Sequence, residues 1–362
     1  MHQIFKLNMI ILVHQYNDYS GSPRVLKSVV EVLRNSNIDY SLFIGGGSEG
    51  YFTTDEFKSF NYSRTNNKFL NIVSFFISQL VLFFKLLTYR NKDIVIYINT
   101  LLPFGAAIFA IVYRKRFIYH IHEVSIKPKV FSTFLNYFAR KSSKIFVVSS
   151  YVRNFYEDVF AKTLLVPNCV SIELASAAQD FNYANCLTNK TVTMIASLRV
   201  YKGVNEFLIL AKYFKEENVK FLLVLNASIE EYTLFFKGKR IPENVKVLCN
   251  VKSIDDIYKQ TTLLLNLSDS EIWIETFGLT LLEAMTFGVP VIAPKVGGHL
   301  DFIVSGECGY LIDSKDIKAL VDKIDFLINN PQACLGLSKN AKIEAKNWSF
   351  DRFNSNLIKN LL

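Results

Sequence analysis

The chain has 362 residues, of which 50% are hydrophobic and 20% are charged. This composition excludes a disordered chain, and the length favours two packed domains over one. The five cysteines include no Cys-x-x-Cys pair, so neither a zinc site nor a disulfide framework is indicated, and the simplest interpretation is a protein of the reducing cytoplasm.

The positive charge is concentrated in the first half of the chain. Residues 1–172 contain 20 Lys and Arg against 10 Asp and Glu, whereas the remaining residues contain 21 against 22. The excess is explained either by a solvated basic surface, or by attraction to anionic lipid head groups or to a phosphate-bearing acceptor. Nucleic acid is not an expected partner, because the aromatic residues lie in apolar segments rather than on a base-stacking platform.

In the first half, short apolar runs rich in β-branched and aromatic residues alternate with longer segments of helical spacing. Segment 1–13 is too short to span a bilayer and lacks a clean small-residue cleavage site, so it is interpreted as a buried first strand. The alternation predicts a parallel sheet with helices on both faces. Strands are expected at Ile10–His14, Tyr40–Ile44, Asp93–Ile98, Phe117–His120, Lys144–Val148 and Thr163–Val166.

Gly45 to Gly50 match the pattern Gly-x-Gly-x-x-Gly directly after an expected strand. In a dinucleotide-binding site this pattern opens a helix. The following residues, from Tyr51 to Asp55, do not form a convincing helix start, and the motif follows the second strand rather than the first. We therefore expect a flexible loop here, which could border an acceptor site.

Phe69–Leu87 is a strongly apolar segment that is rich in phenylalanine. It is interrupted by four polar residues, Asn71, Ser74, Ser78 and Gln79. A membrane-spanning helix is therefore not expected. A helix that lies on the bilayer surface and a helix that covers the first sheet both fit better. The polar positions fall unevenly around the helix, which favours partial contact with a membrane.

Tyr119-His-Ile-His-Glu123 ends a strand and enters a loop. The alternation of side chains along a strand places His120 and His122 on the same side, with Glu123 opposite. A metal site would require further ligands, and the sequence assigns none. A histidine at this position is suited to orienting an acceptor or accepting a proton, and the alternative is a histidine satisfied inside the domain.

The alternation restarts near Lys190 and predicts a second sheet. Ser171–Asn189 is polar and alanine-rich without clear periodicity, so it is interpreted as the linker. Ser349–Leu362 is expected to be a helix that returns to the first domain, with Asp351 near its start. The predicted domains are residues 1–172 with 349–362, and residues 173–348. The second set of strands is expected at Thr191–Ala196, Lys220–Leu225, Val245–Cys249, Leu263–Leu267, Pro290–Ala293 and Gly309–Ile312.

Two basic residues follow the first strand of the second domain. Arg199 and Lys202 lie in Ser197-Leu-Arg-Val-Tyr-Lys-Gly203, at the carboxyl end of a strand, where open α/β sheets bind ligands. A guanidinium fork and a mobile ammonium group are both suited to phosphate oxygens and to the charge on a departing nucleotide. A solvated basic loop is the alternative.

The segment from Glu275 to Ala293 contains the strongest chemical signal. Gly278 precedes a helix, and the free backbone amides at a helix start form a natural diphosphate site. Glu275 before the turn and Glu283 within the helix are a Glu-x7-Glu pair that brackets this site. We expect one carboxylate for each ring of a nucleotide sugar, Glu283 accepting hydrogen bonds from the ribose diol. The alternative is that both are surface acids.

This Glu-x7-Glu segment, with Phe-Gly-Leu before Glu-Ala-Met and Gly-x-Pro-Val-Ile-Ala after it, resembles the signature of family-4 glycosyltransferases of GT-B fold, the glycosyl transferases group 1. Further resemblances follow in the expected order and span most of the chain. They are Pro167-Asn168, Tyr201-Lys202-Gly203, and Val296-Gly297-Gly298 with Asp301. The resemblance implies an α/β protein of two Rossmann-like, doubly wound domains facing a central cleft, with the donor on the C-terminal domain and the acceptor on the N-terminal one.

The resemblance also implies residue roles. Glu275 would contact the donor sugar, Glu283 the ribose, and Arg199 with Lys202 the diphosphate. Backbone groups of Phe277, Gly278 and Leu279 would complete the phosphate site. His122 resembles the loop histidine beside the transferred sugar. Glu275, His122, Lys202 and Arg199 are therefore the expected catalytic residues.

The chain departs from the family pattern at several positions. Ala196-Ser197-Leu198 stands where the family often has Gly-Arg-Leu, so Arg199 is expected to substitute for the usual arginine. Asp301 replaces the commoner glutamate. The N-terminal Gly-Gly loop is represented only by Ser20-Gly-Ser-Pro-Arg24, where Gly21 could approach the donor phosphates and Pro23 is expected to open a helix.

The expected function is a retaining, metal-independent transfer of a sugar from a UDP- or GDP-linked donor, of hexosyltransferase type, with no cofactor. The acceptor would be a glycan or a lipid-linked molecule in cell-surface polysaccharide or glycolipid biosynthesis. The location would be cytoplasmic, with peripheral contact to the anionic inner face of the plasma membrane. Two alternatives stay open, a nucleotide-sugar epimerase or hydrolase of the same fold, and a non-catalytic protein that binds glycan or lipid.

Overall fold

The computed structural model describes residues 9–47, 49–65, 67–124, 126–251 and 253–361. It divides into two compact units, Met1–Asn168 with Asp351–Leu362, and Cys169–Phe350. The domain boundaries proposed from the sequence lie within a few residues of these. Residues 1–8, Ser48 and Leu362, which the sequence-based expectations included, lie outside the described residues.

The first unit is built on a seven-stranded sheet in the order β3-β2-β1-β4-β5-β6-β7, and all its strand pairs are parallel. The central strands β1 and β4 are buried along their whole length, as expected where helices cover both faces of a parallel sheet. The strands are β1 Ile10–His14, β2 Tyr40–Ile44, β3 Lys58–Ser59, β4 Val95–Asn99, β5 Arg116–Ile121, β6 Lys144–Val147 and β7 Leu164–Leu165.

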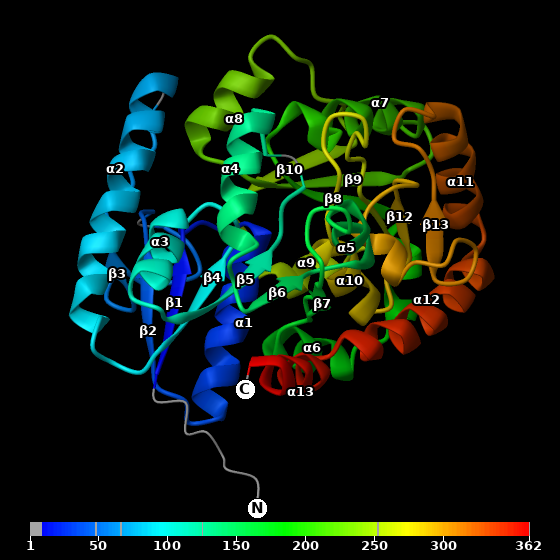
Figure 1. Ribbon diagram of the computed structural model, residues 1–362. Coiled ribbons are helices and arrows are strands. Elements are labelled where there is room, and N and C mark those ends of the chain that lie inside the picture. Colours follow the sequence, from blue (N-terminus) through cyan, green and yellow to red (C-terminus); the bar gives the residue numbers. More distant parts are fainter. Residues whose placement is uncertain (1–8, 48, 66, 125, 252, 362) are drawn as a thin grey trace, which may run out of the picture. The chain divides into compact units, whose positions relative to one another are not determined.

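The helices of the first unit connect these strands and cover the sheet (Figure 1). Neighbouring side chains in the sequence stabilise the start of some of these helices. The side chain of Asn67, for example, accepts hydrogen bonds from the first free amides of α2, which satisfies groups that have no partner within the helix. The helices are α1 Gly21–Asn35, α2 Lys68–Leu86, the 3-10 helix η1 Leu87–Tyr89, α3 Phe104–Val112, α4 Lys129–Ala139, α5 Ser150–Phe155 and α13 Phe350–Leu361.

The second unit repeats this plan with a six-stranded sheet in the order β10-β9-β8-β11-β12-β13. All of its strand pairs are parallel. The strands are β8 Thr191–Ser197, β9 Lys220–Asn226, β10 Val245–Cys249, β11 Leu263–Leu265, β12 Val291–Ala293 and β13 Gly309–Leu311. The α-helices are α6 Ile172–Gln179, α7 Val204–Tyr213, α8 Ile229–Phe236, α9 Ile254–Tyr258, α10 Leu279–Thr286, α11 Ile317–Asn329 and α12 Pro331–Ala345, and the 3-10 helices are η2 Tyr183–Asn189, η3 Val200–Lys202, η4 Gly298–Asp301 and η5 Lys346–Trp348.

Each sheet changes direction once, and this change fixes where a ligand is expected. The strand order reverses between β1 and β4 in the first sheet, and between β8 and β11 in the second. In doubly wound sheets, ligands bind beyond the carboxyl ends of the strands at such a switch point. The doubly wound α/β class expected from the sequence is therefore confirmed, and each unit offers one such position.

Helix α13 belongs to the first unit although it is the last element of the chain. Arg116 of β5 donates a hydrogen bond to the carbonyl of Leu361 at 2.9 Å, and Asn356 donates to the carbonyl of Leu165 in β7 at 3.0 Å. Lys144 of β6 also donates to a carbonyl near the helix end, that of Asn360. Basic side chains at a helix carboxyl end satisfy its free carbonyls.

Two expectations from the sequence need correction. The segment Ser171–Asn189 is not an irregular linker, because it forms α6 and η2 and packs within the second unit. The Tyr183 hydroxyl, for example, donates to the carbonyl of Thr262 at 2.7 Å. The loop after β2 precedes no dinucleotide-type helix, as expected, but it is packed around Asn17. A Cβ on Gly47 would lie 2.1 Å from the carbonyl oxygen of Asn17.

Candidate active site

In the second unit, the structure brings Lys202 and Glu275 together. Lys202 ends η3, just after β8, and Glu275 lies in the loop that follows β11. Lys202 Nζ is 2.8 Å from Glu275 Oε2, and the two side chains are only 18% and 22% exposed. Because β8 and β11 flank the switch point, this ion pair lies where the topology predicts a ligand.

Glycines restrict the backbone next to both residues of the ion pair. Gly203 has a φ of 81°, and a Cβ there would lie 2.2 Å from the carbonyl oxygen of Leu267. On the other side, Gly298 donates a backbone hydrogen bond to the carbonyl of Glu275 at 2.8 Å. A Cβ on the neighbouring Gly297 would lie 2.6 Å from that same carbonyl oxygen. The Gly297-Gly298 loop therefore holds the backbone of Glu275.

Glu275 is kept ionised by its neighbours. Burial by itself raises the pKa of this carboxyl, but the charge and hydrogen bond of Lys202 outweigh that effect. His299 and the side chain of Asn266 act in the same direction. The net result is a pKa of Glu275 below its ordinary value, so the carboxylate is charged at neutral pH.

The start of α10 lies directly after this pair. Gly278 caps the helix with a φ of 90°, and no side chain caps it. The next two residues, Leu279 and Thr280, are half-buried rather than covered. The amides of Leu281 and Leu282 both donate to the carbonyl of Gly278. A helix start that lacks a capping side chain is suited to an anion. Phe277 is buried beside Phe302 and Trp348, so only its backbone is available to such a ligand.

Glu283 lies inside the unit. It is fully buried on α10, and the Tyr258 hydroxyl of α9 donates a hydrogen bond to Glu283 Oε2 at 2.7 Å. The structure therefore places Glu283 in contact with a side chain that the sequence analysis did not single out. Nothing in the local sequence around Tyr258 marks it, because the pairing depends on how α9 packs against α10.

The structure does not bring Arg199 into the Lys202–Glu275 pair. Arg199 is exposed and stands just before η3. Tyr201, two residues further on, stacks on Trp273 with ring centroids 5.1 Å apart and an interplanar angle of 19°. The amide of Asp269 also donates to the carbonyl of Tyr201 at 2.8 Å. These contacts join the loop after β8 to the loop after β11, and sequence reasoning missed them.

The switch point of the first sheet contains a second polar cluster. Asn99, the last residue of β4, accepts a hydrogen bond through Oδ1 from His122 Nε2 at 2.8 Å, while its Nδ2 donates to the carbonyl of Ser22 at 3.0 Å. His14, the last residue of β1, hydrogen-bonds to the Asn99 carbonyl through Nδ1 at 3.2 Å. Because Nδ2 of Asn99 faces a carbonyl, its Oδ1 faces His122, and His122 must carry its proton on Nε2.

His120 lies beside His122 but has a different environment. It is fully buried, and its two ring nitrogens hydrogen-bond to the Tyr97 hydroxyl at 2.6 Å and to the Val166 carbonyl at 3.1 Å. The His120 and His122 rings are 4.6 Å apart, in agreement with the expected shared side. His120 is therefore the satisfied interior histidine, whereas half-buried His122 is the accessible one.

Burial sets the charge of these groups. It lowers the pKa of His14 to about 4 and that of His120 to about 3. The pKa of His122 falls well below 6.5 through burial and through the proximity of His120 and His14. Burial raises the pKa of the neighbouring Glu123 to about 7. At neutral pH the histidines are uncharged, so the free Nδ1 of His122 can accept a proton or a hydrogen bond.

Gly21 is the first residue of α1, and a Cβ there would meet no atom within 4 Å. The helix start is joined to β4 by the Asn99–Ser22 hydrogen bond. Within the described residues, no group of three or more His, Cys, Asp and Glu side chains is arranged to hold a metal ion.

Two family models match this chain. The model for glycosyl transferases group 1 matches residues 177–344, and the model for Glycosyltransferase Family 4 matches residues 19–174. The chain is a glycosyltransferase of this group and family. Its doubly wound sheets are accordingly those of the GT-B fold, which agrees with the resemblance found in the sequence.

Relatives and solved structures support this assignment. The glycosyltransferase is 22% identical over 342 residues to an uncharacterized glycosyltransferase of Haemophilus influenzae, over 92% of this chain and 93% of that one. It is 28% identical over 163 residues to the capsular polysaccharide biosynthesis glycosyltransferase CapM of Staphylococcus aureus, over 43% of this chain and 40% of CapM. The structure of HepE from Anabaena in complex with UDP and glucose superimposes with a TM-score of 0.77 at 20% identity, over 97% of this chain and 98% of HepE.

The substitution Gly297→Ala tests whether this loop positions Glu275. The new Cβ would collide with the Glu275 carbonyl. The sequence predicts a catalytic role for Glu275, and displacement of a group with that role typically costs about a hundredfold in rate. We expect the rate of sugar transfer to fall by about that factor, with the circular dichroism spectrum unchanged. Gly336→Ala in α12 is the control, because a Cβ there meets no atom within 4 Å. Equal rates for the two variants would contradict the role of Gly297.

The first unit is expected to lose stability as the pH falls from 6.5 to 4.5. His14, His120 and His122 have pKa values lowered in the folded state, so the unfolded chain binds more protons in this range, and stability rises with pH. Glu123, with its raised pKa, has the opposite effect between pH 4.5 and pH 7. Because three histidines oppose this single carboxyl group, the net stability still rises with pH. Urea denaturation at both pH values measures the slope. Glu123→Gln should make the increase of the unfolding free energy with pH steeper, because it removes the opposing group. A free energy of unfolding that falls with rising pH would contradict the lowered pKa values of the three histidines.

Proposed function

We propose that this glycosyltransferase moves a sugar from a nucleoside-diphosphate donor, UDP- or GDP-linked, to a glycan or a lipid-linked acceptor, with retained anomeric configuration, without a metal ion, and as a hexosyltransferase. The proposed context is cell-surface polysaccharide or glycolipid biosynthesis on the cytoplasmic side. The observation on which the proposal depends is the ion pair of Lys202 and Glu275 directly before the uncapped helix start at Gly278.

The donor diphosphate would occupy the helix start. Its oxygens would accept hydrogen bonds from the free amides of Leu279 and Thr280, and Gly278 allows the backbone to approach closely. The flexible side chain of Lys202 would turn from Glu275 towards the phosphate and compensate its charge. Arg199, exposed at the same strand end, is proposed to add a second cation. Glu275, released from Lys202, would then accept hydrogen bonds from hydroxyl groups of the donor sugar.

Glu283 is proposed to act from its buried position. The sequence suggested that it binds the ribose, and its contact with Tyr258 offers a route for that role. A ribose diol at the helix would approach the polar group formed by the Glu283 carboxylate and the Tyr258 hydroxyl, which are 2.7 Å apart. Since Glu283 is fully buried, this role requires the donor to displace or share that hydrogen bond.

The chemical step is an exchange of oxygens at the anomeric carbon. The bond from this carbon to the donor phosphate oxygen breaks, and a bond to the acceptor hydroxyl oxygen forms on the same face. The phosphate oxygen leaves with the electron pair, and Lys202 stabilises its charge. The proton of the acceptor hydroxyl passes to the leaving phosphate. The neutral His122, with Nδ1 as a hydrogen-bond acceptor, is proposed to orient that hydroxyl. Gly21 at the start of α1 is proposed to approach the donor phosphates.

The choice of donor base is supported by the comparisons. The HepE structures contain UDP, UDP with glucose, and UDP-glucose. We therefore propose a UDP-sugar as the first candidate and a GDP-sugar as the second.

Binding and product analysis test the reaction class. The purified protein is screened for thermal stabilisation by UDP, GDP and their sugars, because a ligand that binds only the folded state raises its stability. With the stabilising donor and an acceptor, we expect NMR of the product to show a retained anomeric configuration, and EDTA to leave the rate unchanged. Donor consumption at the same rate without acceptor would indicate a hydrolase or epimerase. Calorimetry that shows no binding of any nucleotide sugar would indicate a non-catalytic protein.

Substitutions at the ion pair test the site. Glu275→Gln and Lys202→Ala are each expected to lower the transfer rate by roughly 10²–10³-fold, the usual cost of one electrostatic contact to the transition state. Lys202→Ala should also weaken binding of the nucleoside diphosphate, whereas Glu275→Gln should not. Lys259→Ala is the control, because Lys259 forms an ion pair of 2.6 Å with Asp255 on the surface of the same unit. Unchanged turnover in both site variants would contradict the assignment of Lys202 and Glu275 to the donor site.

A further inference from the structure

Helix α2 is amphipathic in the reverse of the usual sense. A surface helix normally turns its apolar stripe inward and its polar stripe to water. In α2 the polar residues Ser78 and Gln79 are buried together with Leu82 and Leu86. The outward face is apolar, with exposed fractions between 45% and 70% for Phe69, Ile72, Phe76, Ile77, Leu80 and Phe84.

The buried polar residues attach α2 to the rest of the first unit. Gln79 donates to Gln15 Oε1 at 2.9 Å, and its own side-chain oxygen accepts from the amide of Gly105 at 3.1 Å. A Cβ on Gly105 would lie 2.3 Å from the carbonyl oxygen of Gln79, so α2 and α3 are in close backbone contact. Residues Lys68–Tyr89 are long and apolar enough to span a membrane, but only 28% of their most apolar window is buried. A helix attached along one side in this way presents the other side outward and does not enter a bilayer alone.

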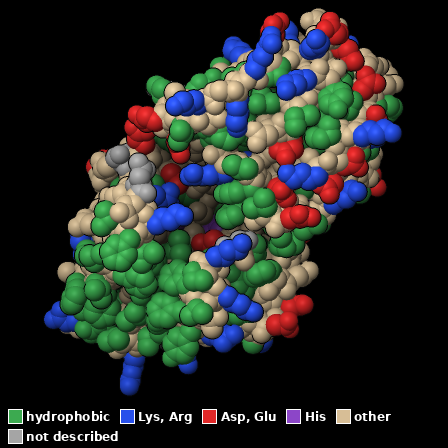
Figure 2. Space-filling model, turned by 90° about the horizontal axis from the view of Figure 1, so that it is seen from above, with side chains coloured by type: hydrophobic (Ala, Val, Ile, Leu, Met, Phe, Trp, Pro, Cys, Tyr) green, Lys and Arg blue, Asp and Glu red, His purple; other side chains and the backbone are tan. Residues whose placement is uncertain are grey.

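The apolar surface continues onto the two neighbouring helices. The ring centroid of Phe76 in α2 lies 5.9 Å from that of Phe104 in α3 and 6.3 Å from that of Phe131 in α4. These contacts join the three helices. Val130 of α4 is 81% exposed and Tyr137 is 55% exposed. Figure 2 shows hydrophobic side chains gathered in one large area on the side where α2 lies in Figure 1. We call this area the α2–α4 face.

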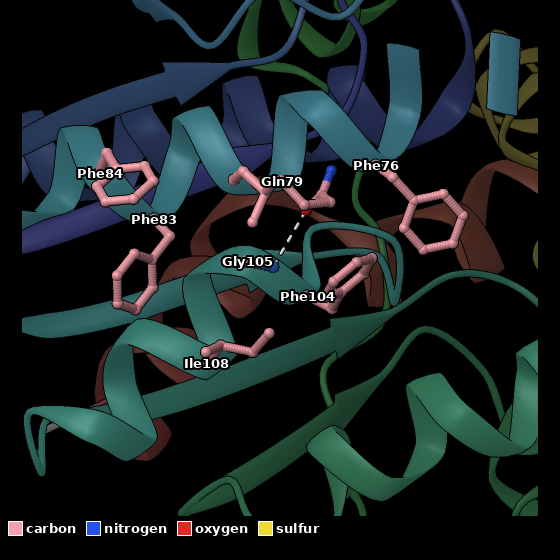
Figure 3. A pocket seen from close by; sticks show the side chains of 8 residues that line it. Phe76, Gln79, Phe83, Phe84, Phe104, Gly105 and Ile108 are labelled. Carbon is pink, nitrogen blue, oxygen red and sulfur yellow. Dashed lines mark hydrogen bonds between the residues drawn. The ribbon is translucent and has the colours of Figure 1, made fainter. Parts of the chain in front are cut away.

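The α2–α4 face contains a groove. It lies between α2 and α3 and has a volume of about 350 Å³. Phe76, Phe83 and Phe84 line it from α2, and Phe104 and Ile108 line it from α3 (Figure 3). Figure 3 also shows the Gln79–Gly105 hydrogen bond, which joins the two helices between which the groove lies. With its polar groups paired, the groove is suited to a hydrocarbon chain and offers no fixed charge to a polar ligand.

The charge around the α2–α4 face has one sign. The three helices that form this face, α2, α3 and α4, contain three lysines, Lys68, Lys85 and Lys129, and no Asp or Glu. Lys68 begins α2, Lys129 begins α4, and Lys141 lies 5.6 Å from the centre of the exposed Tyr137 ring. A second copy of this chain would bring two basic rims together, which opposes self-association through this face. An anionic surface is the complementary partner.

We propose that the α2–α4 face docks flat on a bilayer that contains anionic lipid, with one hydrocarbon chain of that bilayer in the α2–α3 groove. The exposed aromatic and aliphatic side chains enter the boundary between head groups and acyl chains, and the lysines contact lipid phosphates. Because the inner side of α2 is attached to α3 through Gln79 and Gly105, this helix of about 28 Å, at 1.5 Å per residue, lies in the plane of the membrane and not across it. The docking goes beyond the proposed transfer reaction and does not depend on it.

Vesicle flotation of the full chain tests the docking. The probes are vesicles of phosphatidylcholine alone and of phosphatidylcholine with phosphatidylglycerol. We expect the protein to bind the anionic vesicles and to be released by high salt. The triple variant Phe69→Ser, Leu80→Ser, Phe84→Ser should bind the anionic vesicles at least roughly tenfold more weakly than the wild-type chain. Lys127→Glu with Lys129→Glu should weaken binding by a similar factor, since each basic residue near the surface contributes to it.

The matched control lies in the second unit. Ile229 and Leu234 of α8 are 80% and 77% exposed, and Ile229→Ser with Leu234→Ser should leave vesicle binding unchanged. All variants are also tested for binding of UDP and GDP, which reports on the proposed donor site and not on docking. Any of the following results would overturn the proposal: no binding of the wild-type chain to anionic vesicles, equal binding by the triple variant, or a dimer in sedimentation that the triple variant abolishes. Retention in the vesicles after alkaline carbonate extraction would indicate a spanning helix and also overturn it.

Discussion

The ion pair between Lys202 and Glu275 is the interaction around which the second unit's site is arranged. Two opposite charges with less than a quarter of each side chain exposed are costly to desolvate, and each would be more costly alone. The pair is maintained by backbone constraints on both sides, with Gly203 against Leu267 and Gly298 donating to Glu275. A diphosphate at the helix start at Gly278 would compete for Lys202. The pair therefore already contains the two charges that the proposed reaction needs.

The first unit uses the same topological position for a different chemistry. At its switch point, Asn99 links His14, Ser22 and His122 from three segments. Burial keeps these histidines neutral, so this cluster offers hydrogen-bond acceptors rather than charge. One unit is therefore suited to an anionic donor and the other to a hydroxyl group. This division of chemistry agrees with a glycosyltransferase whose two units bind different substrates.

The reversed amphipathicity of α2 has a physical explanation within the unit. The close approach of α2 and α3 leaves no room for a side chain at Gly105, and Gln79 is drawn to the inner side of α2, where it satisfies the amide of Gly105. Phe69, Leu80 and Phe84 lie on the opposite, outer side of the helix. An apolar area of this kind is stable in contact with lipid and unfavourable in water, which is the physical basis of the proposed docking on a bilayer.

The sequence by itself determined every strand except the two-residue β3, together with the two sheets, the returning helix and the Glu-x7-Glu segment, because these depend on local periodicity and on motifs within short stretches. It failed for Ser171–Asn189, where helices form without an apolar repeat because tertiary contacts such as that of Tyr183 stabilise them. Only the tertiary structure decided that Lys202 meets Glu275, 73 residues away in sequence, that Glu283 is buried against Tyr258, and that Asn99 fixes the tautomer of His122. Those pairings arise from the order of strands in each sheet, which brings together strand ends that are distant in the chain.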